Sequence, residues 1–325
     1  MRRPGRAPRR LAVMGVTLAV LTGCGAASHR SASASASPAA STQRGTTSTT
    51  STRHVRPKPR YHGPSYPVFS GLGSLGPHWR VTVRVRGRVA AWVAQRGGVT
   101  MLRFNQHVVR LALHAGSTDP GIGSWPYGDA IVGAERPKLV AAFNSGFKLA
   151  TGSGGWRSGS HTAVALQTGR ASVVTYRNGF TNIGAWGEGV PSHQPIASVR
   201  QNLYLLVNHG VAASDVSSCI ETCWGATVGG VLSVARSAIG IDAHGRLIYG
   251  AAASATPATL AQGMIDGGVR RAAELDINPD WVAAYFYRHA RHKLPQFVPV
   301  IPGQYGVYGH FLIPYSRDFF AVLAR

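Results

Sequence analysis

One segment, from Arg236 to Asp276, constrains the fold of this chain more than any other. Apolar runs at residues 237–242 and 247–252 flank a His-Gly turn signal and predict a β-hairpin. Thr256-Pro257 then predicts the start of a helix, because threonine is a favoured N-cap and proline fits the first helical position. A strand is expected at residues 271–276. The unit is therefore strand, turn, strand, helix, strand, with an arginine at its start and acids at its end.

The rest of the chain is mostly strand-like. Residues 80–86 alternate apolar and basic side chains, which predicts a strand with one wet face. Residues 139–143 are continuously apolar, as expected of a buried central strand. A short C-terminal helix is expected near residues 317–323. Further strands are expected at residues 89–94, 99–104, 107–113, 162–167, 172–176 and 199–207, and those between residues 80 and 113 are expected to form a meander of short antiparallel strands.

This order of elements predicts the fold class. Strands dominate, one helix is clear, and strands and helices do not alternate regularly. We therefore expect an α+β fold: a single β-rich domain with a mixed or antiparallel sheet and few helices, not a doubly wound α/β fold.

The first 24 residues are typical of an export signal. Five arginines precede an apolar run at residues 11–21, which ends in Leu21-Thr22-Gly23-Cys24. A basic region, a short apolar region and small residues before a cysteine match a secretory signal. The ending resembles the lipobox of bacterial lipoproteins, which implies cleavage before Cys24 and lipidation of its thiol. An uncleaved membrane anchor is the alternative, but the apolar run is short for a bilayer span.

Residues 25–67 are expected to form a disordered tether. As far as Thr52 they are almost entirely Ser, Thr, Ala and Gly, and they then become basic and rich in proline. Such a composition cannot bury enough apolar surface to offset the entropy of ordering. Residues 68–325 remain as one folded domain, long enough to bury a real core.

Charge is distributed unevenly along the chain. The formal net charge is +22, and residues 1–66 contain no acid. A basic tether beside a lipid anchor should lie against anionic lipid or wall polymer. Nucleic acid is the other usual partner of such charge, but export and the lack of a nucleic-acid module argue against it. We expect an extracytoplasmic protein, anchored to the cell membrane by lipid.

The cysteine count fits an exported protein. Besides Cys24 there are only Cys219 and Cys223. Outside the cytoplasm a local disulfide is the expected state. A metal pair would need further ligands that the spacing does not supply, and two free thiols are the remaining alternative. No metal or cofactor is expected.

Three segments, in order, carry a resemblance to a known family. They are Ala-Ala-Phe-Asn-Ser-Gly-Phe at residues 141–147, Arg-Ser-Ala-Ile-Gly-Ile at residues 236–241, and Ala-Glu-Leu-Asp at residues 273–276. Over about residues 138–290 the chain resembles the phosphodiester glycosidases, relatives of the lysosomal enzyme that uncovers mannose-6-phosphate. Family members continue Leu-Asp with Gly-Gly-Gly-Ser, whereas this chain has Ile-Asn-Pro-Asp. That difference removes glycine N–H groups suited to binding anions.

The resemblance implies roles for particular residues. Arg236 would hold a phosphate with its planar guanidinium, and Asp276 would be the acid/base or nucleophilic carboxylate. Asn144 would bind sugar or phosphate from its turn. Glu274 and Asp242 are weaker candidates that we expect at the surface. Asn278 and Asp280, which replace the glycines, would supply polar contacts to a different ligand.

A purely structural interpretation remains open beside this one. Arg236 and Asp276 would then form an ion pair between neighbouring strands, and Asn144 would be a turn former. A calcium loop at Asp276, Asn278 and Asp280 is disfavoured, because Pro279 intervenes and the glycine and distal glutamate are missing.

Two functions follow from these observations. The first is a surface-tethered hydrolase that cleaves glycosyl phosphodiester bonds in cell-envelope or extracellular polysaccharide. The second is a catalytically inactive envelope lipoprotein of the same fold, which binds anionic glycan or a partner protein. A structural lipoprotein without a ligand is a third alternative.

Overall fold

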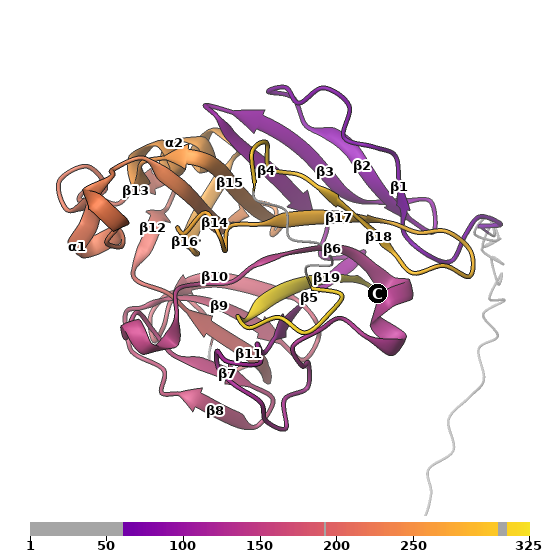
Figure 1. Cartoon of the computed structure of the whole chain (residues 1–325), viewed down its shortest axis with the longest axis horizontal. Coiled ribbons are helices and arrows are strands. Elements are labelled where there is room, and N and C mark those ends of the chain that lie inside the picture. The colour runs from indigo at the N-terminus through magenta and orange to yellow at the C-terminus, as the bar shows by residue number, and fades with distance from the viewer. Residues whose placement is uncertain (1–60, 192, 305–310) are drawn as a thin grey trace, which may run out of the picture. The chain divides into compact units, whose positions relative to one another are not determined.

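The apolar runs of this sequence form three β-sheets in a computed structural model, which describes residues 61–191, 193–304 and 311–325 (Figure 1). The expectations for the signal, the lipidation of Cys24 and most of the tether lie outside these residues. The described residues belong to one compact unit. None of its helices is both long and apolar enough to cross a membrane.

The large sheet has nine strands, which include the hairpin that the sequence predicts. Every neighbouring pair in it is antiparallel. Its spatial order is β1 (Val68–Phe69), β2 (Arg80–Val85), β3 (Arg88–Arg96), β4 (Val99–Phe104), β15 (Leu247–Ala255), β14 (Val234–Asp242), β16 (Val269–Glu274), β12 (Leu205–Asn208) and β13 (Val211–Ala212).

Two five-stranded antiparallel sheets complete the fold. We call them the β6 sheet and the β11 sheet. The β6 sheet has the order β18 (Gln296–Pro299), β17 (Ala284–Arg288), β6 (Leu139–Asn144), β19 (Phe319–Ala324) and β5 (Val109–His114). The β11 sheet has the order β10 (Thr181–Ala185), β9 (Ala171–Tyr176), β11 (Ile196–Gln201), β7 (Trp156–Ser158) and β8 (His161–Val164).

Helices are few among the described residues. The predicted helix start is confirmed: α2 (Pro257–Asp266) begins after Thr256, whose hydroxyl accepts the backbone N–H of Thr259 at 3.1 Å. The other α-helix is α1 (Ile220–Trp224), and the 3₁₀ turns are η1 (Gly133–Lys138), η2 (Leu149–Thr151) and η3 (Val228–Gly230). The expected β-rich domain with few helices is thus confirmed.

The main core lies between the large sheet and the β6 sheet. The Phe143 ring of β6 packs against Phe104 and Tyr249 of the large sheet, at centroid distances of 6.2 and 4.4 Å. Residues 139–144 are all buried, as predicted for a central strand. Burial of aromatic area on this scale is the main favourable contribution to folding.

Three expectations about elements are wrong. The predicted strand at residues 199–207 is two strands, because the chain leaves the β11 sheet near Leu203, which has a φ of 49°. The predicted helix near residues 317–323 is strand β19, whose six residues are buried between β6 and β5. Strand β5 does not extend the β2–β4 meander but forms the edge of the β6 sheet.

A buried ion pair joins β14 to β16. Arg236 Nη1 lies 2.9 Å from Glu274 Oε1, and both side chains are fully buried. Arg236 also donates to the carbonyls of Ala255, at 3.1 Å, and Trp224, at 2.9 Å. Burial raises the pKa of the Glu274 carboxyl, and the neighbouring guanidinium opposes that rise. The expected surface position of Glu274 is therefore wrong, and the partner of Arg236 is Glu274 instead of Asp276.

Replacing Glu274 with alanine should destabilise the fold strongly. The variant Glu274→Ala leaves the Arg236 charge buried without a counterion, so we expect the free energy of unfolding to fall by about 3–5 kcal/mol. The same replacement at the exposed Glu188 should change it by less than about 0.5 kcal/mol. Chemical denaturation of the three proteins measures both effects, and equal losses in the two variants would contradict the assignment.

Candidate functional site

A pocket of about 520 Å³ opens where the ends of β6 and β16 approach the segment before β19. Phe147 and Lys148 follow β6, Asp276 follows β16, and Arg317 precedes β19. The pocket therefore collects residues from three distant parts of the chain. Its wall also includes Thr151, Gly152, Ser153, Arg170, Leu203, Glu221, Thr222, Gly225, Ala226, Ile277, Asn278 and Trp281.

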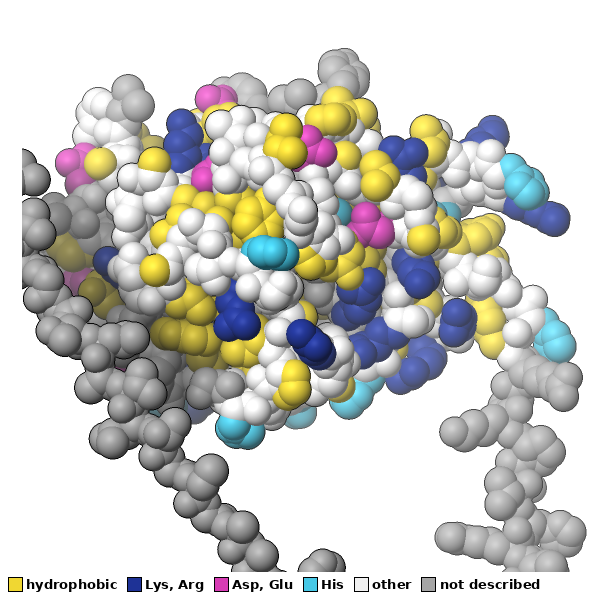
Figure 2. All heavy atoms as spheres, turned by 90° about the horizontal axis from the view of Figure 1, so that it is seen from below, with side chains coloured by type: hydrophobic (Ala, Val, Ile, Leu, Met, Phe, Trp, Pro, Cys, Tyr) yellow, Lys and Arg dark blue, Asp and Glu magenta, His cyan; other side chains and the backbone are white. Residues whose placement is uncertain are grey.

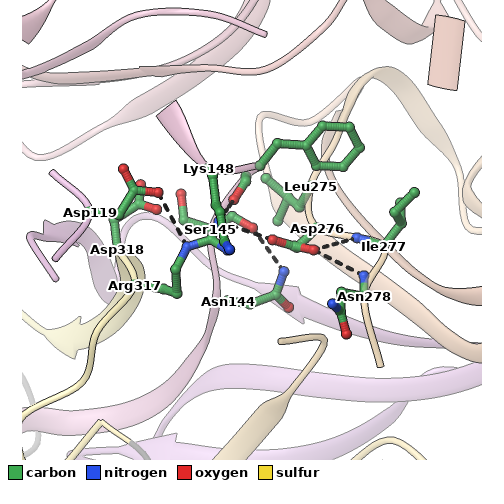
Figure 3. A network of polar contacts seen from close by, with 12 residues as sticks. Asp119, Asn144, Ser145, Lys148, Leu275, Asp276, Ile277, Asn278, Arg317 and Asp318 are labelled. Carbon is green, nitrogen blue, oxygen red and sulfur yellow. Dashed lines mark hydrogen bonds and ion pairs between the residues drawn. The ribbon is translucent and has the colours of Figure 1, made fainter. Parts of the chain in front are cut away.

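Asp276 is the buried acid of this pocket, with 5% of its surface exposed. Its Oδ1 accepts the backbone N–H groups of Ile277, at 2.8 Å, and Asn278, at 3.0 Å (Figure 3). Its Oδ2 accepts Arg317 Nη2 at 3.1 Å. Its own backbone is bonded to Ser145 and Ser237. Both oxygens and the main chain are thus held, so the carboxyl group has a fixed orientation.

Arg317 connects Asp276 to a second acid, Asp119. Arg317 Nε lies 3.2 Å from Asp119 Oδ2, and Nη2 also donates to the Gly146 carbonyl at 2.8 Å. The guanidinium carbon lies 5.3 Å from the centre of the Trp281 ring, within range of a cation–π contact. One cation is therefore shared by two carboxylates that come from different loops (Figure 3).

Burial raises the pKa of both acids. For Asp276, Arg317 and the two backbone N–H groups oppose the rise. For Asp119, the neighbouring Asp318 adds to the rise, while Arg317 and Arg200 oppose it. Both carboxyl groups therefore retain a proton to a higher pH than a free aspartate does. Such a pair can divide the roles of acid and base between its members.

Cations lie around the acids. Lys148 is exposed at the rim, and Arg170 is half-buried with its guanidinium 4.6 Å above the Tyr204 ring. A smaller pocket of about 270 Å³ shares Lys148, Trp281 and Arg317 with the first and reaches Asp119. The two hollows thus lie on either side of shared cationic and aromatic side chains, an arrangement that suits an extended anionic ligand.

A second buried pair supports the loop after β6. Arg200 Nε lies 2.7 Å from Asp318 Oδ2, and both side chains are almost completely buried. Arg200 also donates to the carbonyls of Gln201 and Phe147. Since Asp318 follows Arg317 directly, this pair fixes the segment that carries the pocket arginine.

Asn144 and Arg236 do not line the pocket. The Asn144 amide donates to the Ser145 carbonyl and the Ser237 hydroxyl, and its oxygen accepts Tyr249 Oη at 2.8 Å. It is the last residue of strand β6, paired with Phe319, so it holds strand ends together and does not form the expected turn. Arg236 is enclosed with Glu274, and its bond to the Trp224 carbonyl places it behind the α1 wall.

Of the two polar residues that follow Asp276, one lines the pocket and the other lies outside it. Asn278 lines the pocket, and its side-chain oxygen accepts the Asp280 N–H at 2.8 Å. Asp280 is exposed and does not line it. Within the described residues, no group of three or more His, Cys, Asp or Glu could hold a metal ion.

A disulfide shapes the opposite wall. Cys219 and Cys223 are bonded to each other around α1, which supplies Glu221 and Thr222 to the pocket. Gly225 follows the helix with a φ of 97°, and a Cβ there would lie 2.6 Å from Phe147 Cζ. Only glycine fits both the backbone and the space.

Sequence reasoning missed Asp119, Arg317, Lys148 and Trp281 as members of one site. Asp119 lies in a polar Gly/Pro loop, and Arg317 was expected at the start of a helix. No local signal distinguished Asp119, since the same loop also contains Asp129. Asp242, another early candidate, pairs with Arg246 at 2.6 Å, and its expected surface position is wrong because it is 7% exposed.

Comparison with known proteins gives distant matches only. No family model and no curated protein matches the sequence. Among solved structures, the chain is similar to the zebrafish N-acetylglucosamine-1-phosphodiester α-N-acetylglucosaminidase catalytic domain auto-inhibited by its pro-peptide, with 13% identity and a TM-score of 0.43 over 82% of this chain and 91% of that one. This likeness is a distant one of fold.

Two further solved structures are similar at the same level. One is a hypothetical protein from Synechocystis, with 13% identity and a TM-score of 0.42 over 74% of this chain and 63% of that one. The other is a Burkholderia pseudomallei protein described as exported, with 12% identity and a TM-score of 0.33 over 73% and 75%. The predicted family relationship is thus supported only as distant fold similarity.

The raised pKa of Asp276 can be measured directly. In a carboxyl ¹³C titration, the Asp276 signal, assigned by its loss in Asp276→Asn, should have a midpoint above the value of about 3.9 for a free aspartate. Removing the cation in Arg317→Gln should raise that midpoint further, because Arg317 stabilises the ionised form. Arg317→Lys retains the charge and should shift it less. A midpoint at or below 3.9 in the wild type would contradict the burial argument.

Proposed function

We propose that this chain is an exported hydrolase that cleaves glycosyl phosphodiester bonds in cell-envelope or extracellular polysaccharide. The observation that supports the proposal most is the sharing of Arg317, which lines two adjoining pockets, by Asp276 of the larger pocket and Asp119 of the smaller one. Two carboxyl groups in one cleft are the usual equipment for hydrolysis at an anomeric carbon. The carbohydrate class rests on this chemistry.

The pocket offers a division of roles. Water adds to the anomeric carbon, the bond from that carbon to the phosphate oxygen breaks, and a phosphate monoester leaves. Asp276 or Asp119, when ionised, takes the proton that the water loses. Lys148 and Arg170 bind the phosphate group equally in the substrate and in the departing monoester. Trp281 offers a flat apolar face to a sugar ring.

In this proposal side chains hold the phosphate, because the backbone N–H groups of the turn after Asp276 already have an acceptor. The N–H groups of Ile277 and Asn278 both point at Asp276 Oδ1. They are therefore occupied by the carboxylate and are not donors for a ligand. In this proposal the exposed Lys148 and the half-buried Arg170 supply the charge that glycine amides would supply elsewhere.

The proposal includes a place of action. Cys24 would carry a lipid, and the basic tether would lie against anionic lipid or wall polymer. Nucleic acid is not a proposed partner. The substrate would then be a glycosyl phosphate of the envelope, within reach of a tethered domain.

A second function is favoured by the same ion pairs. Arg317 already neutralises much of the charge of both acids, whereas Lys148 and Arg170 have no acid within the ion-pair distance among the described residues. A catalytically inactive lipoprotein that binds anionic glycan would need only those cations. Its binding would weaken with salt, because exposed charges are screened.

Hydrolysis can be tested with a synthetic sugar-1-phosphodiester. We expect Asp276→Asn to lower kcat by at least about 100-fold and Asp119→Asn to lower it by a similar factor. Lys148→Ala should act mainly on KM. The exposed Asp280→Asn, which changes the same group outside the pocket, should retain wild-type activity. Release of sugar and of phosphate monoester measures each effect.

The same proteins separate the two functions. If folded wild type and Asp276→Asn are equally inactive across a broad panel of glycosyl phosphodiesters, hydrolysis is refuted. Salt-sensitive binding to anionic glycan that survives Asp276→Asn, but weakens about tenfold or more in a Lys148→Ala/Arg170→Ala double variant, would then support the binding protein.

A further inference from the structure

A second basic surface lies away from the Asp276 pocket. The loop between β17 and β18 and the first described residues of the chain lie side by side at the right of Figure 1 and enclose a hollow of about 820 Å³. We call this surface the hairpin face. Its Lys, Arg and His members are His62, Arg136, His289, Arg291, His292 and Lys293.

No acid balances this charge. None of the described residues that line the hollow is Asp or Glu. Residues 61–118 and 281–317, which supply most of the surface, contain no acid at all. The nearest acid in the sequence, Glu135, lies 3.3 Å from His114 Nε2. At the right-hand end of the molecule in Figure 2, Lys, Arg and His side chains are visible and no Asp or Glu side chain is.

The turn between β2 and β3 extends the hairpin face. A Cβ on Gly87 would lie 3.1 Å from the Tyr61 ring, so this turn is beside the start of the described chain. Arg84, Arg86 and Arg88 surround Gly87 and are exposed. The Arg288 guanidinium lies 5.9 Å from the centre of the Phe69 ring, which places β17 close to the same strands.

The hairpin face also has an apolar component. Leu294, at the end of the loop, is 64% exposed, and Tyr61 is 47% exposed. Lone exposed apolar residues are ordinary. Leu294 directly follows Arg291, His292 and Lys293 in one loop, so an exposed apolar side chain lies beside cations that can contact headgroup phosphates.

We propose that the hairpin face docks on the surface of a membrane that contains anionic phospholipid. Lys and Arg neutralise headgroup phosphates, and Leu294 enters the apolar boundary beneath them. The chain reaches this face directly from its basic N-terminal segment, which leads back to Cys24. A soluble phosphate polymer would use the cations but would gain nothing from Leu294.

This docking does not depend on the proposed hydrolysis. The hollow of the hairpin face shares no lining residue with the Asp276 pocket. Loss of catalysis would leave the docking unchanged, and loss of docking would leave catalysis on a soluble substrate unchanged. The two proposals can therefore fail separately.

Vesicle flotation tests the docking. The full chain with Cys24→Ser, which cannot be lipidated, is mixed with phosphatidylcholine vesicles with and without phosphatidylglycerol. An added Arg291→Ser/Lys293→Ser change should weaken binding to the anionic vesicles about 25-fold, at about fivefold for each cation. The control Arg177→Ser/Arg270→Ser removes two other exposed arginines and should weaken it less than twofold.

Leucine 294 separates a membrane from a soluble polyanion. Leu294→Ser should weaken binding to anionic vesicles about tenfold and leave binding to soluble polyphosphate unchanged. If Arg291→Ser/Lys293→Ser and the control Arg177→Ser/Arg270→Ser lost vesicle binding equally, the docking proposal would be overturned. So would binding to polyphosphate without binding to vesicles, which would assign the face to a soluble anionic polymer. The substituted arginines, Lys293 and Leu294 lie at exposed positions, and thermal melting checks that each variant is folded.

Discussion

Arg317 is the residue on which the candidate site depends. It enters from the segment before β19 and contacts acids from two other loops, Asp119 and Asp276, as well as the carbonyl that follows β6. Without this cation, the buried Asp276 and the half-buried Asp119 would lose the contact that links them, and the pKa of each carboxyl group would rise further. The link between the two acids, and part of the stabilisation of their ionised forms, therefore come from one guanidinium.

Three buried arginine–acid contacts lie in and near the candidate site, and each connects a different pair of segments. Arg236–Glu274 joins β14, β16 and α1 away from the pocket, Arg200–Asp318 fixes the segment before β19, and Arg317 alone reaches the pocket. Buried ion pairs contribute little net stability, because desolvation offsets their attraction. Their effect here is geometric: Arg200–Asp318 and Arg317–Asp276 connect segments that belong to different sheets, whereas Arg236–Glu274 connects two strands of the large sheet.

Local signals in the sequence predict the local parts of this structure. The hairpin and α2 follow from turn and capping residues that lie next to one another, and both are present. The C-terminal strand was mistaken for a helix because Phe319–Ala324 is buried on both faces and has no alternation to reveal a strand. The same error hid Arg317, which comes just before that strand, 41 residues from Asp276.

The residues after Asp276 determine what the turn at that position can bind. In this chain the acid uses the amides of Ile277 and Asn278 for itself, so the turn stabilises the carboxylate rather than a bound anion. Any anionic ligand must then be matched by flexible side chains such as Lys148. Mobile, exposed cations bind phosphate less rigidly than fixed amides and are screened more by salt. In the proposed function, attraction of a charged polymer and orientation of a reacting bond are therefore separate tasks, and only the second requires the Asp276–Arg317–Asp119 arrangement.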